Sequence, residues 1–422
     1  MIPDPLSAAE EAGIDVFIAP GQATYTVTRL PEGAGDCADV TGIRVTAPTQ
    51  AGLVWGAAQV LAEKAAGAPV TQGEFDPPYA RRGLHVDSAR HFFEPQHIHD
   101  LLHIMAWGRL NVMNLHLSEN EGCRLPSQRH PEIMSEAHFS REDIRGFIEE
   151  GQRLGITVIP SIDMPGHLGR ALEGNEWAQL RDQDGTPIRG ALDILNPEAI
   201  AFAWDILDEA VELFGAEEVT IGGDEFLDLG VGVPALHAAA QERFGPDAAE
   251  NDLWIDFVNR TVERLAAKGV RSGVWNDGIR GRRVVDLDRR ALLHHWTRWG
   301  QHMAAPCELS DHDMVNWDAD ALYFVLRRDQ LHLLPTFDSV WDNFEPSLFL
   351  DRVGHTRLRN VEGAVFSIWC DEPDALSTVS IVRLAKDPIL AFACRCWPLG
   401  GLHGKAAVHS AFSAVTQERE GK

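Results

Sequence analysis

From Arg82 onward, segments typical of strands alternate with segments typical of helices along the rest of the chain. The strand-like segments are short, and one of them, Val219–Ile221, is a β-branched run that is typical of a buried strand. About eight strand–helix pairs fit, which is the pattern of a parallel (β/α)8 barrel. An open doubly wound sheet would alternate in the same way, but it requires a glycine-rich phosphate loop after its first strand. The sequence has no such loop there.

The predicted strands cover residues 83–87, 111–117, 156–160, 219–221, 272–275, 291–296, 321–324 and 363–369. The predicted helices between and after them cover residues 95–107, 140–154, 199–214, 252–268 and 379–392. Active groups of such barrels stand where strands end and loops begin. Polar and aromatic residues collect at the predicted ends: Asp87, His116, Glu119, Asp163, His167, Asp224, Glu225, Trp275, Trp296, Tyr323, Trp369 and Asp371.

A smaller unit precedes the barrel. Residues 24–27 and 42–46 have the alternating pattern of short strands, and residues 51–66 have the pattern of an amphipathic helix. The paired prolines at 77 and 78 end regular structure. We therefore expect a small, truncated α/β domain over residues 1–78 and a catalytic barrel over residues 79–422.

Charge and hydropathy narrow the classes of partner. The 422 residues carry a formal net charge of -26, from 37 basic and 63 acidic side chains. This balance disfavours binding to nucleic acid or to an anionic membrane surface. No segment approaches the roughly 18 uninterrupted apolar residues of a membrane span, and the first residues lack the basic and apolar regions of a signal peptide. We expect a cytoplasmic protein, and the sequence leaves its oligomeric state open.

Cysteine and histidine spacing gives no support for a metal centre. The chain has six cysteines and 18 histidines, but no CxxC pair and no HExxH motif. Neighbouring histidines such as His294 and His295 are more often packing residues than ligands. We expect free thiols, no metal and no cofactor.

Two adjacent carboxylates, Asp224 and Glu225, follow the strand-like run from Val219 and the glycines at 222 and 223. Neighbours on a regular strand face opposite sides, but glycines let the backbone turn, so that both carboxylates can face one pocket. Paired acids at a strand end suit acid-assisted bond cleavage, and two like charges this close raise at least one pKa. The alternative is a solvated acidic turn.

Four motifs together resemble glycoside hydrolase family 20, the β-N-acetylhexosaminidases. They are residues 82–93, 111–117, 163–167 and 221–225, and they occur in the family's order. Trp275, Trp296 and the segment 367–369 fit later landmarks, and the match covers about residues 79–400. The resemblance implies a retaining exo-enzyme that removes a terminal β-linked N-acetylglucosamine or N-acetylgalactosamine from an oligosaccharide or glycoconjugate.

The resemblance also implies a role for each site residue. The substrate's own acetamido group is the nucleophile in this family. Glu225 would be the general acid/base, Asp224 would hold the acetamido N–H and stabilise the oxazolinium intermediate, and Tyr323 would donate to the acetamido oxygen. The residues implied to bind the sugar are Trp275, Trp296 and Trp369 as apolar walls, and Arg82 and Asp371 at its hydroxyls. Those implied to support the pocket are Glu119, His167, His116 and Asp163 around the acid, with Asp87 and Arg90 beside them.

The chain departs from the family pattern in two places. The family commonly has aspartate where Glu119 and Asn120 stand, and one added methylene alters hydrogen-bond geometry beside a tuned acid. Residues 118–122 resemble a bacterial branch that includes N-acetylglucosaminidases and lacto-N-biosidase-like enzymes. The unit before the barrel is shorter than usual, so either the protein is a trimmed intracellular version or its start lies upstream.

Three alternatives stay open. A lacto-N-biosidase type would release a disaccharide, and the depth of the pocket, which sequence does not give, decides between the two. A sugar-binding protein without catalysis would have no need of both Asp224 and Glu225. A metal hydrolase would lose its activity on chelation.

Overall fold

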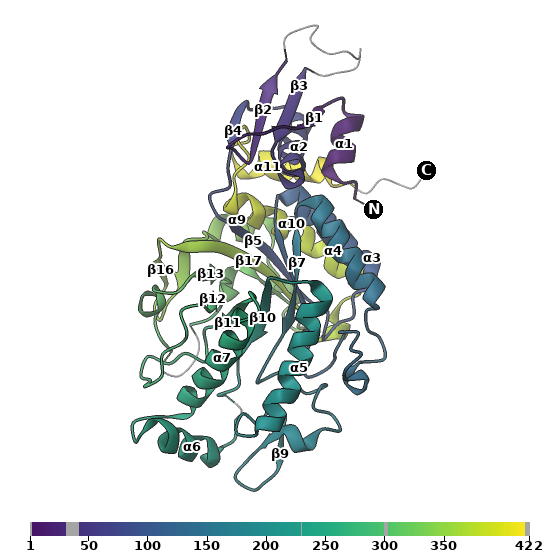
Figure 1. Cartoon of the computed structure of the whole chain (residues 1–422). Helices are drawn as coiled ribbons and strands as arrows, with labels where there is room; N and C mark the ends of the chain where they lie inside the picture. The colour runs from purple at the N-terminus through teal and green to yellow at the C-terminus, as the bar shows by residue number, and fades with distance from the viewer. Residues whose placement is uncertain (1, 31–41, 229, 299–302, 418–422) are drawn as a thin grey trace.

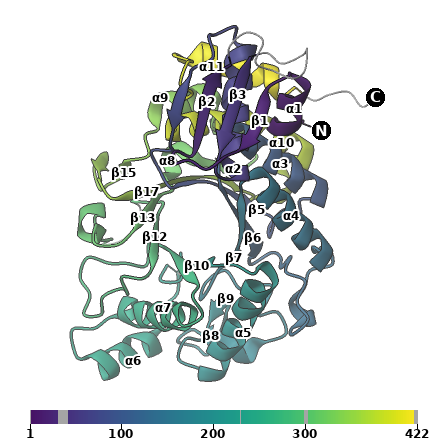
Figure 2. The ribbon, with the colours of Figure 1, turned by 45° about the horizontal axis from the view of Figure 1, so that its top comes forward.

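The computed structural model describes residues 2–30, 42–228, 230–298 and 303–417. Within them, eight parallel strands close into a barrel, which confirms the predicted fold (Figures 1 and 2). In the order in which they pair, these strands are β5 (Arg81–Asp87), β6 (Val112–Ser118), β7 (Thr157–Ile162), β10 (Glu218–Gly222), β11 (Arg271–Trp275), β12 (Leu292–His295), β13 (Met314–Asn316) and β17 (Val361–Trp369). Pairing of β13 with β17 closes the ring.

The barrel strands are buried on both faces. All seven residues of β5 are buried, and so are the last seven residues of β17, which pairs with it. A parallel sheet with filled interior and covered exterior needs such continuous burial, which explains why the sequence shows apolar runs rather than alternation.

Helices cover the outside of the barrel. They are α3 (Pro95–Gly108), α4 (Arg141–Leu154), α5 (Pro197–Phe214), α7 (Glu250–Ala266) and α10 (Thr378–Cys396). Helix α4 begins with the capping box expected from Ser140 and Asp143, in which each side chain accepts the other residue's backbone N–H. Left-handed residues, Gly155 and Gly215, end α4 and α5 and turn the chain toward the next strand.

The seventh strand differs from the prediction. Residues 321–324 were expected to form it, but Ala319–Leu322 is a short helix, α8, and Tyr323–Val325 is an additional strand, β14. β13 pairs with the first part of β17 and β14 with its last part. A three-residue strand such as β13 shows no periodicity, so the sequence pattern missed it.

Excursions from the barrel include further short elements. They are β8 (Gln179–Arg181), β9 (Pro187–Leu192), α6 (Pro234–Phe244), α9 (Phe337–Asn343), β15 (Leu348–Leu350) and β16 (His355–Arg357). None of the described helices is long and apolar enough to cross a membrane. The five cysteines in the described part are unpaired, and Cys37 lies outside it.

The N-terminal unit is a four-stranded sheet in the order β1-β3-β2-β4, packed on helix α2 (Figure 1). Its elements are α1 (Pro5–Glu11), β1 (Asp15–Ile18), β2 (Tyr25–Arg29), β3 (Ile43–Ala47), α2 (Gln50–Ala65) and β4 (Gly73–Phe75). The two strands and the helix expected here are present. The last described helix, α11 (Lys405–Val415), returns to contact α2, so this helix also packs on the N-terminal unit. The boundary at residue 78 stays a prediction.

Candidate active site

A pocket of about 370 Å³ opens at the carboxyl ends of the barrel strands. Its size falls within the usual range for small-molecule sites. The lining residues are Arg90, His167, Asp224, Glu225, Trp275, Trp296, Ala319, Tyr323, Val325, Arg327, Gln330, Trp369 and Asp371. All three predicted catalytic residues are among them.

The turn after β10 aims the two carboxylates into this pocket. Gly222 and Gly223 have φ angles of 69° and 97°, in the left-handed region. A Cβ on Gly222 would lie 2.2 Å from Asp163 Oδ1, and one on Gly223 would lie 2.8 Å from the ring of Trp254. Only glycine fits at either position, and the bend lets adjacent carboxylates line one pocket.

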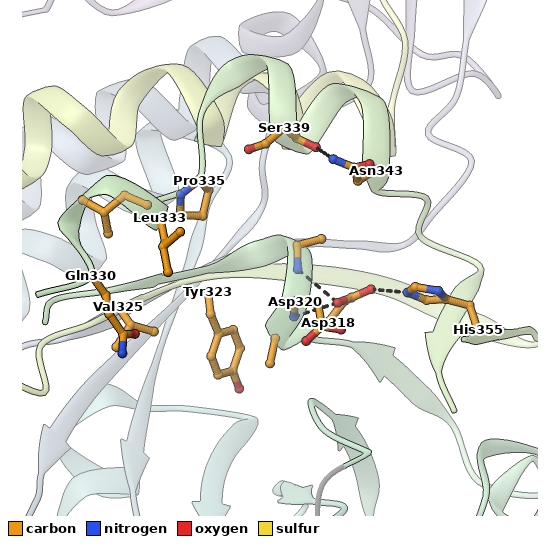
Figure 3. A pocket seen from close by; sticks show the side chains of 13 residues that line it. Asp318, Asp320, Tyr323, Val325, Gln330, Leu333, Pro335, Ser339, Asn343 and His355 are labelled. Carbon is orange, nitrogen blue, oxygen red and sulfur yellow. Dashed lines mark hydrogen bonds and ion pairs between the residues drawn. The ribbon is translucent and has the colours of Figure 1, made fainter. Parts of the chain in front are cut away.

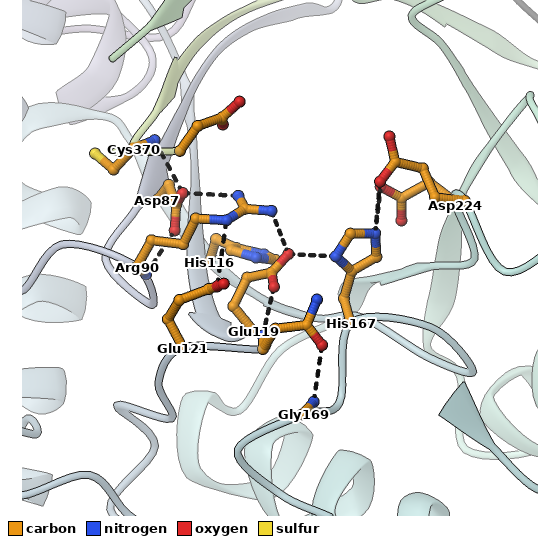
Figure 4. A network of polar contacts seen from close by, with 12 residues as sticks. Asp87, Arg90, His116, Glu119, Glu121, His167, Gly169, Asp224 and Cys370 are labelled. Carbon is orange, nitrogen blue, oxygen red and sulfur yellow. Dashed lines mark hydrogen bonds and ion pairs between the residues drawn. The ribbon is translucent and has the colours of Figure 1, made fainter. Parts of the chain in front are cut away.

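His167 links the two carboxylates to a buried acid behind them (Figure 4). Its Nε2 lies 3.4 Å from Asp224 Oδ2 and 3.4 Å from Glu225 Oε2. On its other side, Nδ1 lies 2.5 Å from Glu119 Oε1, which also pairs with Arg90 Nη2 at 2.6 Å. The imidazole therefore stands between three carboxylates.

The pKa values of His167 and Glu119 are shifted in opposite directions. Burial would lower the pKa of His167, but Asp224 and Glu119 raise it well above its usual range. Burial would raise the pKa of Glu119, but His167 and Arg90 bring it down to about 2. A charged His167 beside an ionised Glu119 follows from these two shifts.

The pKa values of the adjacent carboxyls, Asp224 and Glu225, are also shifted in opposite directions. Burial, with the charge of Glu225 adding to it, raises the pKa of Asp224. The hydrogen bond from His167 lowers the pKa of Glu225. The pKa raised by proximity of like charges is therefore that of Asp224, and not that of the carboxyl expected to act as the acid.

Aromatic rings form the walls. Trp296 and Tyr323 stack with centroids 6.0 Å apart and planes 3° apart, and Tyr323 lies 5.9 Å from Trp369. Trp275 packs edge-on against Trp317 at 4.5 Å. Trp317 is fully buried directly after β13, and sequence analysis missed it together with that strand.

Arg82 is not part of the pocket. It lies near the start of β5, where Nε donates to Arg109 O at 2.9 Å and Nη1 donates to Tyr79 O at 2.8 Å. Its guanidinium packs over the rings of Trp55 and Trp397, and the residue is 1% exposed. Each strand residue advances the chain by about 3.3 Å, so Arg82 is most of a strand away from the active end. The structure contradicts the predicted sugar contact.

Arg90 occupies the pocket instead. It follows the carboxyl end of β5, pairs with Asp87 at 3.0 Å and lies over the Trp369 ring at 5.6 Å from its centroid. Asp87 also accepts the backbone N–H of Cys370 at 3.0 Å, which ties the ends of β5 and β17 together. The rule that active groups follow strand ends points to Arg90 rather than Arg82.

Asp371 lines the pocket, and it pairs with a residue that sequence analysis missed. Arg327 Nη2 lies 2.8 Å from Asp371 Oδ2. Arg327, Val325 and Gln330 belong to β14 and the loop after it, whose position on β17 the sequence pattern did not indicate.

The catalytic-domain model of glycosyl hydrolase family 20 matches residues 79–367. The chain belongs to glycosyl hydrolase family 20. A lacto-N-biosidase of Bifidobacterium bifidum is 26% identical over 380 residues, covering 85% of this chain and 33% of that protein. A beta-hexosaminidase of Emericella nidulans is 26% identical over 271 residues, covering 58% of this chain and 44% of that protein.

A solved family 20 structure shares the fold. The exo beta-N-acetylglucosaminidase from Vibrio harveyi, in complex with N-acetylglucosamine, has a TM-score of 0.73 at 19% identity. The match covers 97% of this chain and 70% of that one. The chain thus spans a third to less than half of the two curated relatives, but most of this structural neighbour.

Behind the family 20 pocket lie His116 and Asp163, which do not line it. Burial lowers the pKa of His116 to about 4, and burial together with Asp224 raises the pKa of Asp163 well above its usual range. Ligand atoms of His116, Glu119 and Asp163 lie within 4.8 Å of one another, a spacing that a metal ion could use. A cation there would compete with Arg90 and His167, whose positive charges already hold Glu119.

A second pocket of about 410 Å³ shares Ala319, Tyr323, Val325 and Gln330 with the first. Its far side includes Asp318, which pairs with His355 at 3.1 Å. Figure 3 shows the Tyr323 hydroxyl directed away from the side chains of α9 that line this second pocket.

Proposed function

We propose that the protein is a retaining exo-β-N-acetylhexosaminidase, which removes a terminal β-linked N-acetylglucosamine or N-acetylgalactosamine from an oligosaccharide or glycoconjugate. One observation carries the proposal: Asp224 and Glu225 stand side by side in one pocket with a hydroxyl donor, Tyr323, and three tryptophans. Family membership supplies the substrate-assisted chemistry, in which the acetamido oxygen attacks the anomeric carbon.

Asp224 is suited to hold the acetamido group. Its Oδ1 is buried and, within the described residues, has no hydrogen-bond partner, so an acceptor is available for the acetamido N–H. His167 on its other oxygen favours the ionised form. An ionised Asp224 stabilises the positive charge that develops on the oxazolinium ring.

Glu225 is suited to protonate the leaving oxygen. Its side chain is 60% exposed, and a bound sugar covers it. Removing water raises a carboxyl pKa, which offsets the lowering by His167 and favours the protonated form at the moment of cleavage. The same group then activates water for the second step.

Tyr323 and the tryptophans act on the rest of the sugar. Burial and the charge of Asp224 raise the pKa of Tyr323 well above its usual range, so its hydroxyl stays protonated and can donate to the acetamido oxygen. The faces of Trp275, Trp296 and Trp369 suit the apolar C–H faces of the sugar. Arg90 and Asp371 offer charged hydrogen-bond partners for its hydroxyls.

A second candidate is disaccharide release. The similarity to a lacto-N-biosidase covers 85% of this chain, and the second pocket adjoins the first through shared lining residues. Both observations favour a longer substrate, which the same catalytic pair would cleave by the same chemistry.

Release of 4-nitrophenol from its β-N-acetylglucosaminide, β-N-acetylgalactosaminide and β-lacto-N-bioside tests both candidates. We expect the native protein to be active on at least one of the monosaccharides. Asp224→Asn and Glu225→Gln should each reduce kcat/KM by about 10²- to 10⁴-fold, the range of a positioned acid or base. Activity unchanged by EDTA is expected, because no step uses a metal. Cleavage of the disaccharide alone would support the second candidate, and inactivity on all three would contradict both.

A further inference from the structure

Asp277, two residues beyond β11, makes two hydrogen bonds that no expected role accounts for. Its Oδ2 accepts the backbone N–H of Glu225 at 2.7 Å, and its Oδ1 accepts the indole N–H of Trp296 at 3.0 Å. One carboxylate therefore joins the ends of three successive barrel strands, β10, β11 and β12. Asp277 itself is not among the residues that line the pocket.

The backbone of Glu225 has particular need of such a partner. Its φ angle is 56°, a left-handed conformation that a residue with a Cβ adopts only under constraint. A carboxylate that accepts a backbone N–H makes a stronger bond than a neutral acceptor. The contact fixes the peptide unit from which the Glu225 side chain leaves, and so its direction toward the leaving oxygen and toward His167.

Close packing in turn fixes Asp277. A Cβ on the next residue, Gly278, would lie 2.6 Å from the ring of Trp254, so this stretch of chain is held against that ring. Trp254 Nε1 also donates to Gly223 O at 2.8 Å. Two hydrogen bonds therefore hold the turn that carries Asp224 and Glu225. Trp254 bonds the residue before the two acids, Gly223, and Asp277 bonds the backbone of Glu225.

The electrostatic surroundings of Asp277 bear on its role as the acceptor of both hydrogen bonds. Burial and the charge of Asp224 raise the pKa of Asp277 to about 7, while the bonds from Glu225 N and Trp296 act in the opposite direction. The ionised carboxylate has acceptors for both N–H groups. An asparagine of the same shape has one acceptor oxygen and one NH₂ group, which would face a donor.

We propose that Asp277 is a positioning residue for the leaving-group step: it holds the general acid Glu225 and the pocket wall Trp296 in register without contacting the sugar. The expected kinetic effects rest on the proposed function. The expected positioning of Glu225 and Trp296 rests only on their two hydrogen bonds to Asp277.

A leaving-group series tests the kinetic consequence. Aryl β-N-acetylglucosaminides from 2,4-dinitrophenyl to 4-methoxyphenyl, and the disaccharide chitobiose, need increasing help from the acid. We expect Asp277→Asn to lower kcat/KM for chitobiose by about 10²-fold, as for a misplaced acid, and to change the dinitrophenyl substrate by no more than about threefold. Glu225→Gln should show the same gradient, larger in size.

Asp252→Asn is the matched control. Asp252 is buried. It accepts the backbone N–H groups of Val284 and Val285, at 2.7 Å and 2.9 Å, which lie in the loop between β11 and β12 that also carries Asp277. It contacts neither Glu225 nor Trp296, so its loss should lower thermal stability without a leaving-group gradient. An equal loss across the series in Asp277→Asn, or no loss, would overturn the positioning role.

A second measurement needs no turnover. The pKa of Glu225, followed by ¹³C NMR of labelled glutamate carboxyls and assigned with Glu225→Gln, should rise in Asp277→Asn, because the displaced acid loses its bond from His167. An unchanged pKa would count against the proposal. If the native protein proves inactive on every glycoside, the proposed function fails, and this shift alone decides whether Asp277 positions Glu225.

Discussion

Two arginines eight positions apart in one motif end in different surroundings. Arg82 fills the region between α2 and the start of β5, and Arg90 fills the pocket at the other end. The motif itself could be recognised in the sequence, but the assignment of its arginines depended on counting residues along a strand. Once β5 is known to end at Asp87, only the later arginine can reach the pocket at that end of the barrel.

Arg90→Ala should therefore reduce kcat/KM by about 10- to 100-fold, the loss expected for charged hydrogen bonds to the substrate. Arg82→Met should leave kcat/KM within about twofold and lower the free energy of unfolding by about 2 kcal/mol, because one buried and one partly buried carbonyl lose their donor. Steady-state kinetics and urea unfolding of both variants check this. Equal kinetic losses in the two variants would contradict the placement.

At the scale of elements, long apolar runs and helix caps could be predicted, because each is set by local sequence. The capping box of α4 and the strands flanking the pocket are examples. The contacts of Asp277, Arg327 and Trp317 could not be predicted from the sequence, because they join loops that follow different strands. β13 and β14 were misassigned because each has three residues, too few for a period to show.

The turn after β10 gives a prediction at this scale. Gly222→Ala should reduce activity by at least about 10²-fold, because the new methyl group overlaps Asp163 and moves both catalytic carboxylates. Gly215→Ala is the control: it has a φ angle of 57° with nothing within 4 Å of a Cβ. That variant should lose only about 1 kcal/mol of stability through strain, with normal kcat. Normal activity in Gly222→Ala would show that the turn tolerates displacement.

For the whole molecule, the buried charge network makes stability depend on pH. Glu119 has a pKa of about 2 in the fold against an ordinary 4.5, so its contribution is present above pH 4.5 and is lost as pH falls toward 2. Glu119→Gln should cost roughly 3 kcal/mol near neutrality, and the difference from the native protein should shrink below pH 4.5. Urea unfolding at several pH values measures it. The exposed Glu142→Gln should show no such convergence, and a constant gap for Glu119→Gln would contradict the shift.

The overall architecture could be predicted from the sequence because seven of the eight barrel strands, all except β13, coincide with predicted strands, and helices follow most of them along the chain. The packing of α11 on α2 could not be predicted from the sequence, because the two helices lie far apart along the chain. The cytoplasmic location stays a prediction from the sequence.

The pairing of β13 and β14 with different parts of β17 separates closure of the barrel from the lining of the pockets. β13 alone completes the ring with β17, while β14 is laid on the same strand farther along. The segment from α8 to α9, which brings Tyr323, Val325 and Gln330 to the pockets, therefore takes no part in closing the ring. A change in the length or composition of this segment would therefore alter the lining of both pockets and leave the strand pairing that closes the barrel unchanged.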